Sequence, residues 1–166
     1  KIFKLIDHEI TNVKQGKPAF IKLKLNSISS YMMIDKLYEA SRAGVKIQMI
    51  IRGICCIIPG VKGMSENIEI ISIVDKFLEH TRLYVFCNDN NPKVYISSAD
   101  WMTRNIENRV EVSCPIYDQD IKQELLDIFE ISWNDNVKAR ILNETQDNIY
   151  KKNKLPKVRT QFETYN

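Results

Sequence analysis

The stretch 19–52, AFIKLKLNSISSYMMIDKLYEASRAGVKIQMIIR, decides the fold class of this chain. Its first part, Ala19–Asn26, alternates between two faces with a period of two residues, which predicts a β-strand. From about Ser30 the apolar residues recur at helical spacing, and Gly44 supplies a C-terminal stop. Val45–Ile51 then predicts a second strand. Because a helix separates the two strands, we expect them to be parallel neighbours in an α/β sheet.

The rest of the chain continues this mixture of helices and strands. Ile2–Val13 repeats apolar residues at helical spacing, and Asp118–Trp133 does so more clearly. We therefore expect an α/β domain with a mixed, mostly parallel sheet flanked by helices. The other expected elements are a strand at Ile70–Val74, a helical turn at Asp75–Glu79, a hairpin of strands at Arg82–Phe86 and Lys93–Ser97, and a strand at Val110–Ser113.

Composition is typical of a soluble globular domain. The 166 residues are 44% hydrophobic and 27% charged, which is enough apolar material for one core. A formal net charge of +3 is too small to predict a nucleic-acid partner, and no apolar run is long enough to cross a bilayer. The four cysteines lack the spacing of a zinc site, so we expect them to be reduced. The chain opens without an initiator Met, and we expect it to be a fragment of a longer protein.

Polar residues gather where the predicted strands end. Lys24–Ser27, Arg52-Gly53 and Ser97–Asp100 each follow an apolar strand. In open α/β sheets, ligands usually bind beyond the carboxyl ends of parallel strands. An arginine beside a glycine suits phosphate oxygens, because the guanidinium binds them and the glycine lets them approach the backbone. The alternative is that these strand ends simply return to water.

The stretch 78–86, LEHTRLYVF, places His80 two residues before Arg82. In an extended segment these two side chains face one side, while Leu83 and Val85 face the other. A histidine beside a cation can share one phosphoryl group, because the imidazole attacks it or exchanges a proton while the cation offsets the oxygen charge. For the short pattern alone, the alternative is a surface histidine beside a solvated arginine.

The sequence after this pattern resembles the HKD half-motif of the phospholipase D superfamily. In that superfamily H-x-K precedes a strand end of small residues and a later Glu. Here Arg82 stands in place of the lysine, and Cys87 stands in place of an aspartate. These departures argue against a working phosphodiesterase.

Three longer blocks resemble the C-terminal part of the long form of bacterial polyphosphate kinase, which is built on two phospholipase-D-like domains. They are MIDKLYEASRAGVKIQMIIRGICC, ISIVDKFLEHTRLYVF and VYISSADWMTRNIENRVEV. The resemblance runs from about Leu23 to Arg159. It implies that residues 1–166 are a single phospholipase-D-like domain of a larger enzyme, with a basic helical tail over 150–166.

The resemblance also implies an activity. Family members reversibly transfer the γ-phosphoryl group of ATP to polyphosphate with Mg²⁺, through a phosphohistidine in the preceding domain. Mg²⁺ would be bound mainly by that domain, and no metal ligands are expected in this chain. His80 would face the phosphohistidine and act as a catalytic residue. Arg52 would bind the ATP phosphates, and Lys24 and Asn26 would line the same edge. Positive charge nearby would come from three further arginines, Arg82, Arg104 and Arg109, of which Arg109 is the best candidate.

The resemblance further implies partners and a location. ATP, ADP and inorganic polyphosphate would be the substrates and products, the upstream domains of the same chain would complete the site, and the whole protein would form a homo-oligomer. We expect a cytoplasmic enzyme, with peripheral association at the inner membrane as an open alternative. The basic tail would either steer polyphosphate or act as a solubilising end. Because the phosphohistidine lies elsewhere, the isolated chain is expected to be inactive.

Two other functions remain open at this point. One is a phospholipase-D-type phosphodiesterase or nuclease, which needs two H-x-K histidines and would have to dimerise around this single H-x-R. The other is a non-catalytic module that binds polyanions.

Overall fold

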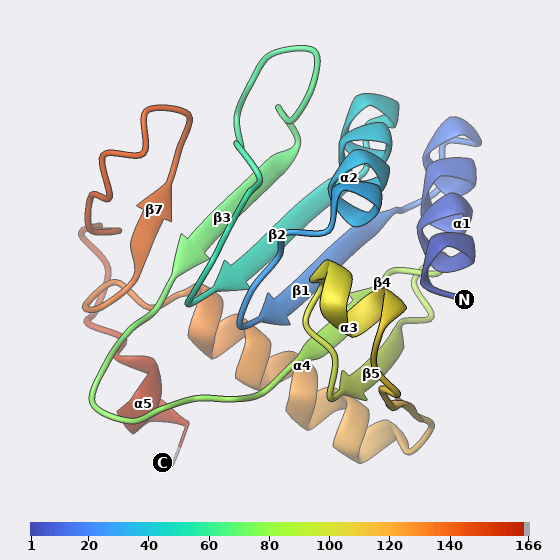
Figure 1. The fold of residues 1–166 in the computed structure, drawn as a ribbon. Coiled ribbons are helices and arrows are strands. Elements are labelled where there is room, and N and C mark those ends of the chain that lie inside the picture. The colour runs from blue at the N-terminus through green and yellow to red at the C-terminus, as the bar shows by residue number, and fades with distance from the viewer. Residues whose placement is uncertain (165–166) are drawn as a thin grey trace.

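The computed structural model describes residues 1–164, which form three layers around one mixed sheet (Figure 1). The seven strands lie in the order β6-β5-β4-β1-β2-β3-β7. Helices α1 and α2 cover one face of the sheet, and α4 covers the other (Figure 1). The predicted α/β fold is therefore confirmed. The strands are β1 (Phe20–Leu25), β2 (Lys46–Ile51), β3 (Ile68–Ser72), β4 (Leu83–Phe86), β5 (Lys93–Ser97), β6 (Ser113–Ile116) and β7 (Arg140–Leu142). The helices are α1 (Ile2–Lys14), α2 (Tyr31–Ala43), α3 (Thr103–Glu107), α4 (Gln119–Trp133) and α5 (Thr160–Glu163).

The β1-α2-β2 unit forms as its sequence predicts. β1 and β2 pair in parallel, with Leu25 opposite Ile51 at the carboxyl end of both strands. Helix α2 stops at Gly44, whose φ of 102° lies in the left-handed region that glycine adopts without a Cβ penalty. The backbone N–H groups of Gly44 and Val45 then close the last turn onto the carbonyls of Ser41 and Ala40. This turn feeds the chain directly into β2.

The expectation of mostly parallel pairing is wrong. Only the β1–β2 and β2–β3 pairs of the described residues are parallel, whereas β1–β4, β4–β5, β5–β6 and β3–β7 are antiparallel. The reason lies after β3. The chain stays at the edge where β3 ends, passes to the other side of β1 without a helix and begins β4 at that same edge, so β4 runs antiparallel to β1. The short turn after β4 then makes β5 antiparallel to β4.

Two apolar cores hold the layers together. The larger lies between the sheet and α1 and α2, and includes Ile21, Leu23 and Met49. The smaller lies under α4, where Phe129 and Trp133 pack on Leu83 and other sheet residues. Trp101 is fully buried in the larger core, and Trp133 is nearly fully buried in the smaller one.

Several local predictions need correction. Residues 75–79 form no helical turn, and residues 73–82 run as an irregular segment that we call the His80 loop. The strand predicted at Val110–Ser113 lies three residues later, because Ser97 of β5 pairs with Ser113. The tail is helical only at Thr160–Glu163, since residues 151–159 lack regular structure. The end of the predicted tail, residues 165–166, lies outside the described residues.

The directions of the strands locate the edge of the sheet at which a ligand site is expected. Strands β1, β2 and β5 end at one edge, and β4 begins at that same edge because it is antiparallel to both β1 and β5 (Figure 1). The His80 loop runs along this edge from β3, past α5, to β4 (Figure 1). Among residues 1–164, no helix has both the length and the apolar character needed to span a bilayer.

Candidate phosphate-binding site

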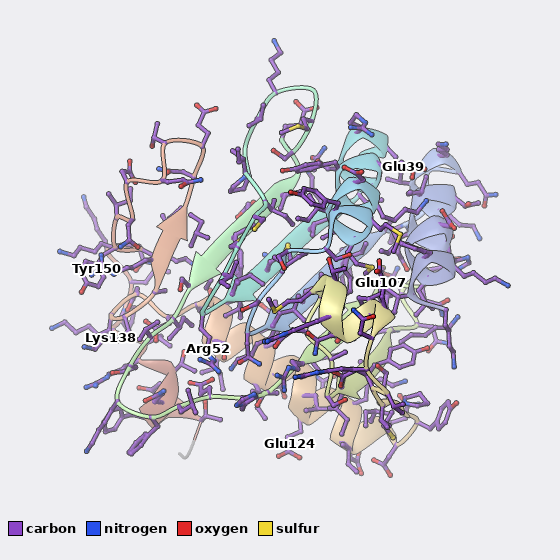
Figure 2. The ribbon with its side chains drawn as sticks, viewed as in Figure 1. Glu39, Arg52, Glu107, Glu124, Lys138 and Tyr150 are labelled. Atoms are coloured by element: carbon purple, nitrogen blue, oxygen red, sulfur yellow. The ribbon has the colours of Figure 1, made fainter. Side chains whose placement is uncertain are left out.

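Four chain segments bring the polar residues of this edge together. Asn26 follows β1, Arg52 follows β2, Arg82 precedes β4, and Asp100 lies three residues beyond β5. Parallel pairing puts Asn26 and Arg52 side by side, because Leu25 and Ile51 are register partners. Figure 2 shows Arg52 at the end of β2, at the open edge of the sheet. The strand ends therefore converge as the sequence predicts.

Arg52 is held by Asn26 and not by a carboxylate. Its Nε donates to Asn26 Oδ1 at 2.6 Å. No other residue in the described part of the chain accepts a hydrogen bond from the terminal nitrogens of Arg52, so its charge is not neutralised by a neighbour. A guanidinium fixed at Nε presents its outer nitrogens to a ligand, and two such nitrogens match the spacing of phosphate oxygens.

Asp100 is the centre of the network. Its Oδ1 accepts from the backbone N–H of Asn26 at 2.8 Å and of Ser27 at 3.1 Å. Its Oδ2 accepts from Asn26 Nδ2 at 3.3 Å and from Arg82 NH2 at 2.9 Å. Asp100 is only 6% exposed, so these bonds are shielded from water. One buried carboxylate thus joins the ends of β1, β4 and β5.

Arg82 in turn contacts His80. Its NH2 lies 3.0 Å from His80 Nε2, and its NH1 donates to the His80 carbonyl oxygen at 3.3 Å. Arginine has no acceptor atom, so His80 Nε2 must be the acceptor and the ring proton must lie on Nδ1. The predicted meeting of His80 and Arg82 is confirmed, although both precede the strand. An unbroken chain of hydrogen bonds now runs from Arg52 through Asn26, Asp100 and Arg82 to His80.

Gly53 permits the close approach of the β1 and β2 ends. Its N–H donates to the Asn26 carbonyl oxygen at 2.8 Å. A Cβ at position 53 would lie 2.9 Å from that oxygen, a distance that real Cβ atoms essentially never show, and at a tight 3.0 Å from Ser27 Oγ. Any other residue would therefore push Asn26 away and disturb its contacts with Arg52 and Asp100.

Lys24, which was expected to line the phosphate site, is also engaged within the protein. It is 8% exposed and forms an ion pair with Glu79 of the His80 loop. Lys24 thus ties the loop to β1. No role was expected for Glu79, although its position beside His80 in the sequence was the available signal.

Arg109 lies beyond the hydrogen-bonded network. It is exposed after α3, and within residues 1–164 no hydrogen bond or ion pair joins it to His80 or Arg52. Glu111 accepts from Ser98 and from Asn105, and these bonds, with smaller contributions from Arg109 and Arg82, hold the pKa of Glu111 below its usual range. The positive charge of Arg109 therefore acts near Glu111, at the rim of the site. Arg104 is exposed on α3.

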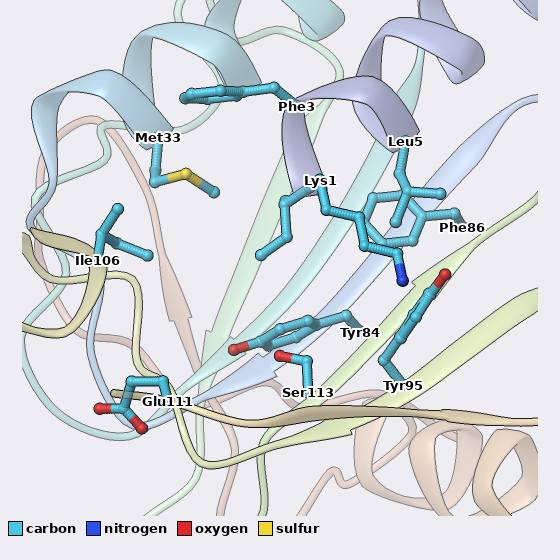
Figure 3. A pocket seen from close by; sticks show the side chains of 11 residues that line it. Lys1, Phe3, Leu5, Met33, Tyr84, Phe86, Tyr95, Ile106, Glu111 and Ser113 are labelled. Carbon is cyan, nitrogen blue, oxygen red and sulfur yellow. The ribbon is translucent and has the colours of Figure 1, made fainter. Parts of the chain in front are cut away.

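A separate apolar cavity of about 410 Å³ lies between the start of α1 and strands β4–β6 (Figure 3). Its walls are mostly apolar and aromatic, with Glu111 at one side (Figure 3). None of the predicted site residues lines it. Among the described residues, no group of three His, Cys, Asp or Glu side chains could hold a metal ion. The candidate site is therefore the edge network, with arginine and histidine as its chemical groups.

The family model described as polyphosphate kinase C-terminal domain 2 matches the sequence of residues 1–161. The chain belongs to the polyphosphate kinase family. It is 53% identical over 166 residues to polyphosphate kinase of Vibrio cholerae and 46% identical over 165 residues to that of Escherichia coli K12. In both comparisons 99% of this chain is covered but only 24% of the relative, so the chain spans about a quarter of those polyphosphate kinases.

Solved structures agree with this family. The crystal structure of polyphosphate kinase from Porphyromonas gingivalis superposes with a TM-score of 0.95 at 45% identity, covering 98% of this chain and 25% of that one. Nuc, a phospholipase D family member from Salmonella typhimurium, superposes with a TM-score of 0.56 at 16% identity, covering 81% of this chain and 88% of that one. At that identity the second likeness shows the fold alone, and it confirms the predicted phospholipase-D-like architecture.

The network should make this polyphosphate kinase domain sensitive to acid. Burial alone would raise the pKa of Asp100, but hydrogen bonds from Arg82 and from the Ser27 and Asn26 amides outweigh it and lower that pKa. Arg159 likewise lowers the pKa of Asp75. A carboxylate with a depressed folded pKa stabilises the fold above its unfolded pKa of about 3.9, and this contribution disappears as pH falls through the folded value.

We expect the urea midpoint of unfolding to be steady from pH 7 to 5 and to drop below pH 4. Each extra proton bound on unfolding changes the free energy of unfolding by about 1.4 kcal/mol per pH unit. Urea titrations at several pH values check this, and Asp75→Asn should flatten the drop. A midpoint that stays constant down to pH 3 would contradict it.

Proposed function

We propose that this chain is the C-terminal catalytic domain of an ATP:polyphosphate phosphotransferase. The single observation that carries the proposal is the continuous hydrogen-bonded connection from Arg52 to His80 at one sheet edge, in a chain of this family. A cation with free donors and a histidine within one network suit a transferred phosphoryl group.

The proposed reaction has two displacements. A histidine nitrogen of another domain attacks the γ-phosphorus of ATP, the bond to the β,γ-bridging oxygen breaks, and ADP leaves. A terminal oxygen of polyphosphate then attacks the phosphohistidine, and the P–N bond breaks. In both steps Arg52 would bind phosphate oxygens, and the His80 Nδ1–H would donate to the transferred group, since Nε2 is engaged by Arg82. The protein's role is thus positioning and charge neutralisation.

Magnesium is proposed to bind elsewhere in the whole protein. The edge network offers arginine, lysine, histidine and amide groups, and its one buried carboxylate, Asp100, is already bound by four donors. This donor set does not fit a divalent cation, which prefers several oxygen ligands. When bound to the nucleotide, Mg²⁺ would neutralise phosphate charge.

The remaining assignments are also proposals. ATP, ADP and polyphosphate would be the substrates and products, upstream domains of the same chain would supply the phosphohistidine, and the whole protein would be a homo-oligomer. The four free cysteines support a reducing, cytoplasmic location, with peripheral membrane association still open. Residues 1–166 would act as a single domain of the whole enzyme. Its basic tail would either steer polyphosphate or act as a solubilising end.

Incubation with γ-labelled ATP tests the function. The full-length protein should acquire label on histidine and pass it to acid-insoluble polyphosphate. The isolated 166-residue chain should do neither, because the proposed phosphohistidine belongs to another domain. The chain's histidine other than His80, His8, cannot replace that group, since it lies exposed on α1, away from the network. Phosphodiester cleavage by the chain alone would favour the nuclease alternative. Polyphosphate binding without turnover in both proteins would favour a polyanion-binding module.

A further inference from the structure

The His80 loop is not fixed by its own backbone. In the described part of the chain, no hydrogen bond between backbone groups involves residues 74–81. Its apolar side chains are also largely outside the core, since Val74 is 70% exposed, Phe77 is 54% exposed and Leu78 is 74% exposed. A loop with neither backbone pairing nor apolar burial pays a large entropy cost to stay in one conformation. Side chains from elsewhere must therefore position His80.

Gln161, near the C-terminal end of the described chain, supplies the closest substitute for backbone pairing. Its Oε1 accepts from the Phe77 N–H at 2.8 Å, and its Nε2 donates to the Phe77 carbonyl oxygen at 2.7 Å. The same Nε2 donates to Glu79 Oε1 at 3.1 Å. Gln161 is only 6% exposed, so water competes little for these bonds. Its amide thus pairs with the loop as a neighbouring strand would, three residues before His80.

The segment that carries Gln161 is itself anchored to the body of the domain. Asp135, fully buried beyond α4, accepts from the Thr160 N–H at 2.9 Å. Arg159 forms a two-point contact with Asp75 at the start of the loop, with distances of 2.8 and 2.7 Å. Residues 159–161 therefore connect the buried residue after α4 to the beginning and middle of the His80 loop.

We infer that Gln161 is a positioning residue for His80, acting with Arg159 through the loop and through Glu79. This inference rests on the proposed phosphotransferase function. Glu79 links the two sides, because one of its oxygens accepts from Gln161 and the other pairs with Lys24 of β1. The loop is thereby bound on one side to the C-terminal segment and on the other to the central strand β1. These contacts fix the position of His80 relative to the edge of the sheet.

Amide hydrogen exchange tests the contact without using activity. The only acceptor for the Phe77 N–H among the described residues is Gln161 Oε1. In the full-length protein that carries this chain, Gln161→Met keeps the length of the side chain but removes both hydrogen-bonding atoms. We expect exchange at Phe77 to accelerate by roughly tenfold or more. Glu163→Gln, on the same short helix and exposed, is the matched control and should leave it unchanged. Equal exchange in the wild type and Gln161→Met would overturn the inference.

Turnover tests the consequence for catalysis. Gln161→Met should lower kcat about ten- to a hundredfold with little change in the KM for ATP, because misplacing a catalytic group by about 1 Å costs that much while Arg52 still binds the nucleotide. Faster exchange at Phe77 with unchanged kcat would overturn the positioning role. A wild-type protein that transfers no phosphoryl group would refute the proposed function and the kinetic claim together, while the exchange result would still decide whether Gln161 holds the loop.

Discussion

Replacing Arg52 or His80 by alanine in the full-length protein is expected to lower the rate of phosphoryl transfer about 10²–10³-fold, the usual cost of removing one preorganised charged or hydrogen-bonding group. Arg52 should matter because its outer nitrogens have no protein acceptor in the described structure, so its charge is available to the phosphates. His80 should matter because Arg82 already binds its Nε2, so its Nδ1–H remains the donor that can bind the transferred phosphoryl group.

Matched variants separate these roles from general effects of lost charge. Arg42→Ala removes an exposed arginine on α2, and His8→Ala removes an exposed histidine on α1. Both should keep nearly normal rates. Arg52→Lys should recover only part of the loss, because lysine cannot bind Asn26 through Nε and phosphate through two further nitrogens. Steady-state production of polyphosphate measures all five variants, and near-normal rates in both Arg52→Ala and His80→Ala would refute the site.

Asp100→Ala is expected to have the largest effect on stability. The change leaves the N–H groups of Asn26 and Ser27 without their acceptor and removes the counter-charge of Arg82, whose side chain is only 14% exposed. Breaking such a buried pair from one side typically costs about 3–5 kcal/mol of unfolding free energy. Urea unfolding followed by tryptophan fluorescence measures this, since Trp101 adjoins Asp100 in the chain.

Two further variants make the Asp100 experiment specific. Asp100→Asn keeps one oxygen for the backbone donors but loses the charge, so we expect a smaller loss of about 1–3 kcal/mol. Asp89→Asn is the control, because Asp89 pairs with Lys17 through half-exposed side chains at 3.0 Å and such surface pairs are worth about 1 kcal/mol or less. If Asp100→Ala is no more destabilising than Asp89→Asn, Asp100 does not hold the strand ends together.

Local sequence patterns predicted much of the fold and of the site. The β1-α2-β2 unit, the β4–β5 hairpin and helix α4 formed within a few residues of their predicted bounds, because apolar periodicity and turn residues act over short distances. The same locality explains the convergence of Asn26 and Arg52. Both follow adjacent parallel strands, so a strand-end rule suffices.

The misplaced elements depend on contacts far along the chain. Strand β6 begins at Ser113 because it pairs with β5, and the segment 75–79 is irregular because Arg159 and Gln161 bind it across more than 80 residues of sequence. Asp100 was visible only as one polar residue in a strand-end cluster, since nothing in its neighbours shows that it accepts from β1 and from Arg82.

The sequence by itself determined the family, through three separate blocks of residues. It also determined the central strand-helix-strand unit and the pairing of a histidine with a nearby arginine, because each of these two features lies within roughly thirty consecutive residues. Only the tertiary structure decided that most strand pairs are antiparallel, that Asp100 joins three strand ends, and that the C-terminal segment holds the His80 loop. Those features arise from hydrogen bonds between residues distant in the chain, and the choice among such bonds depends on how the whole sheet assembles and buries its polar groups.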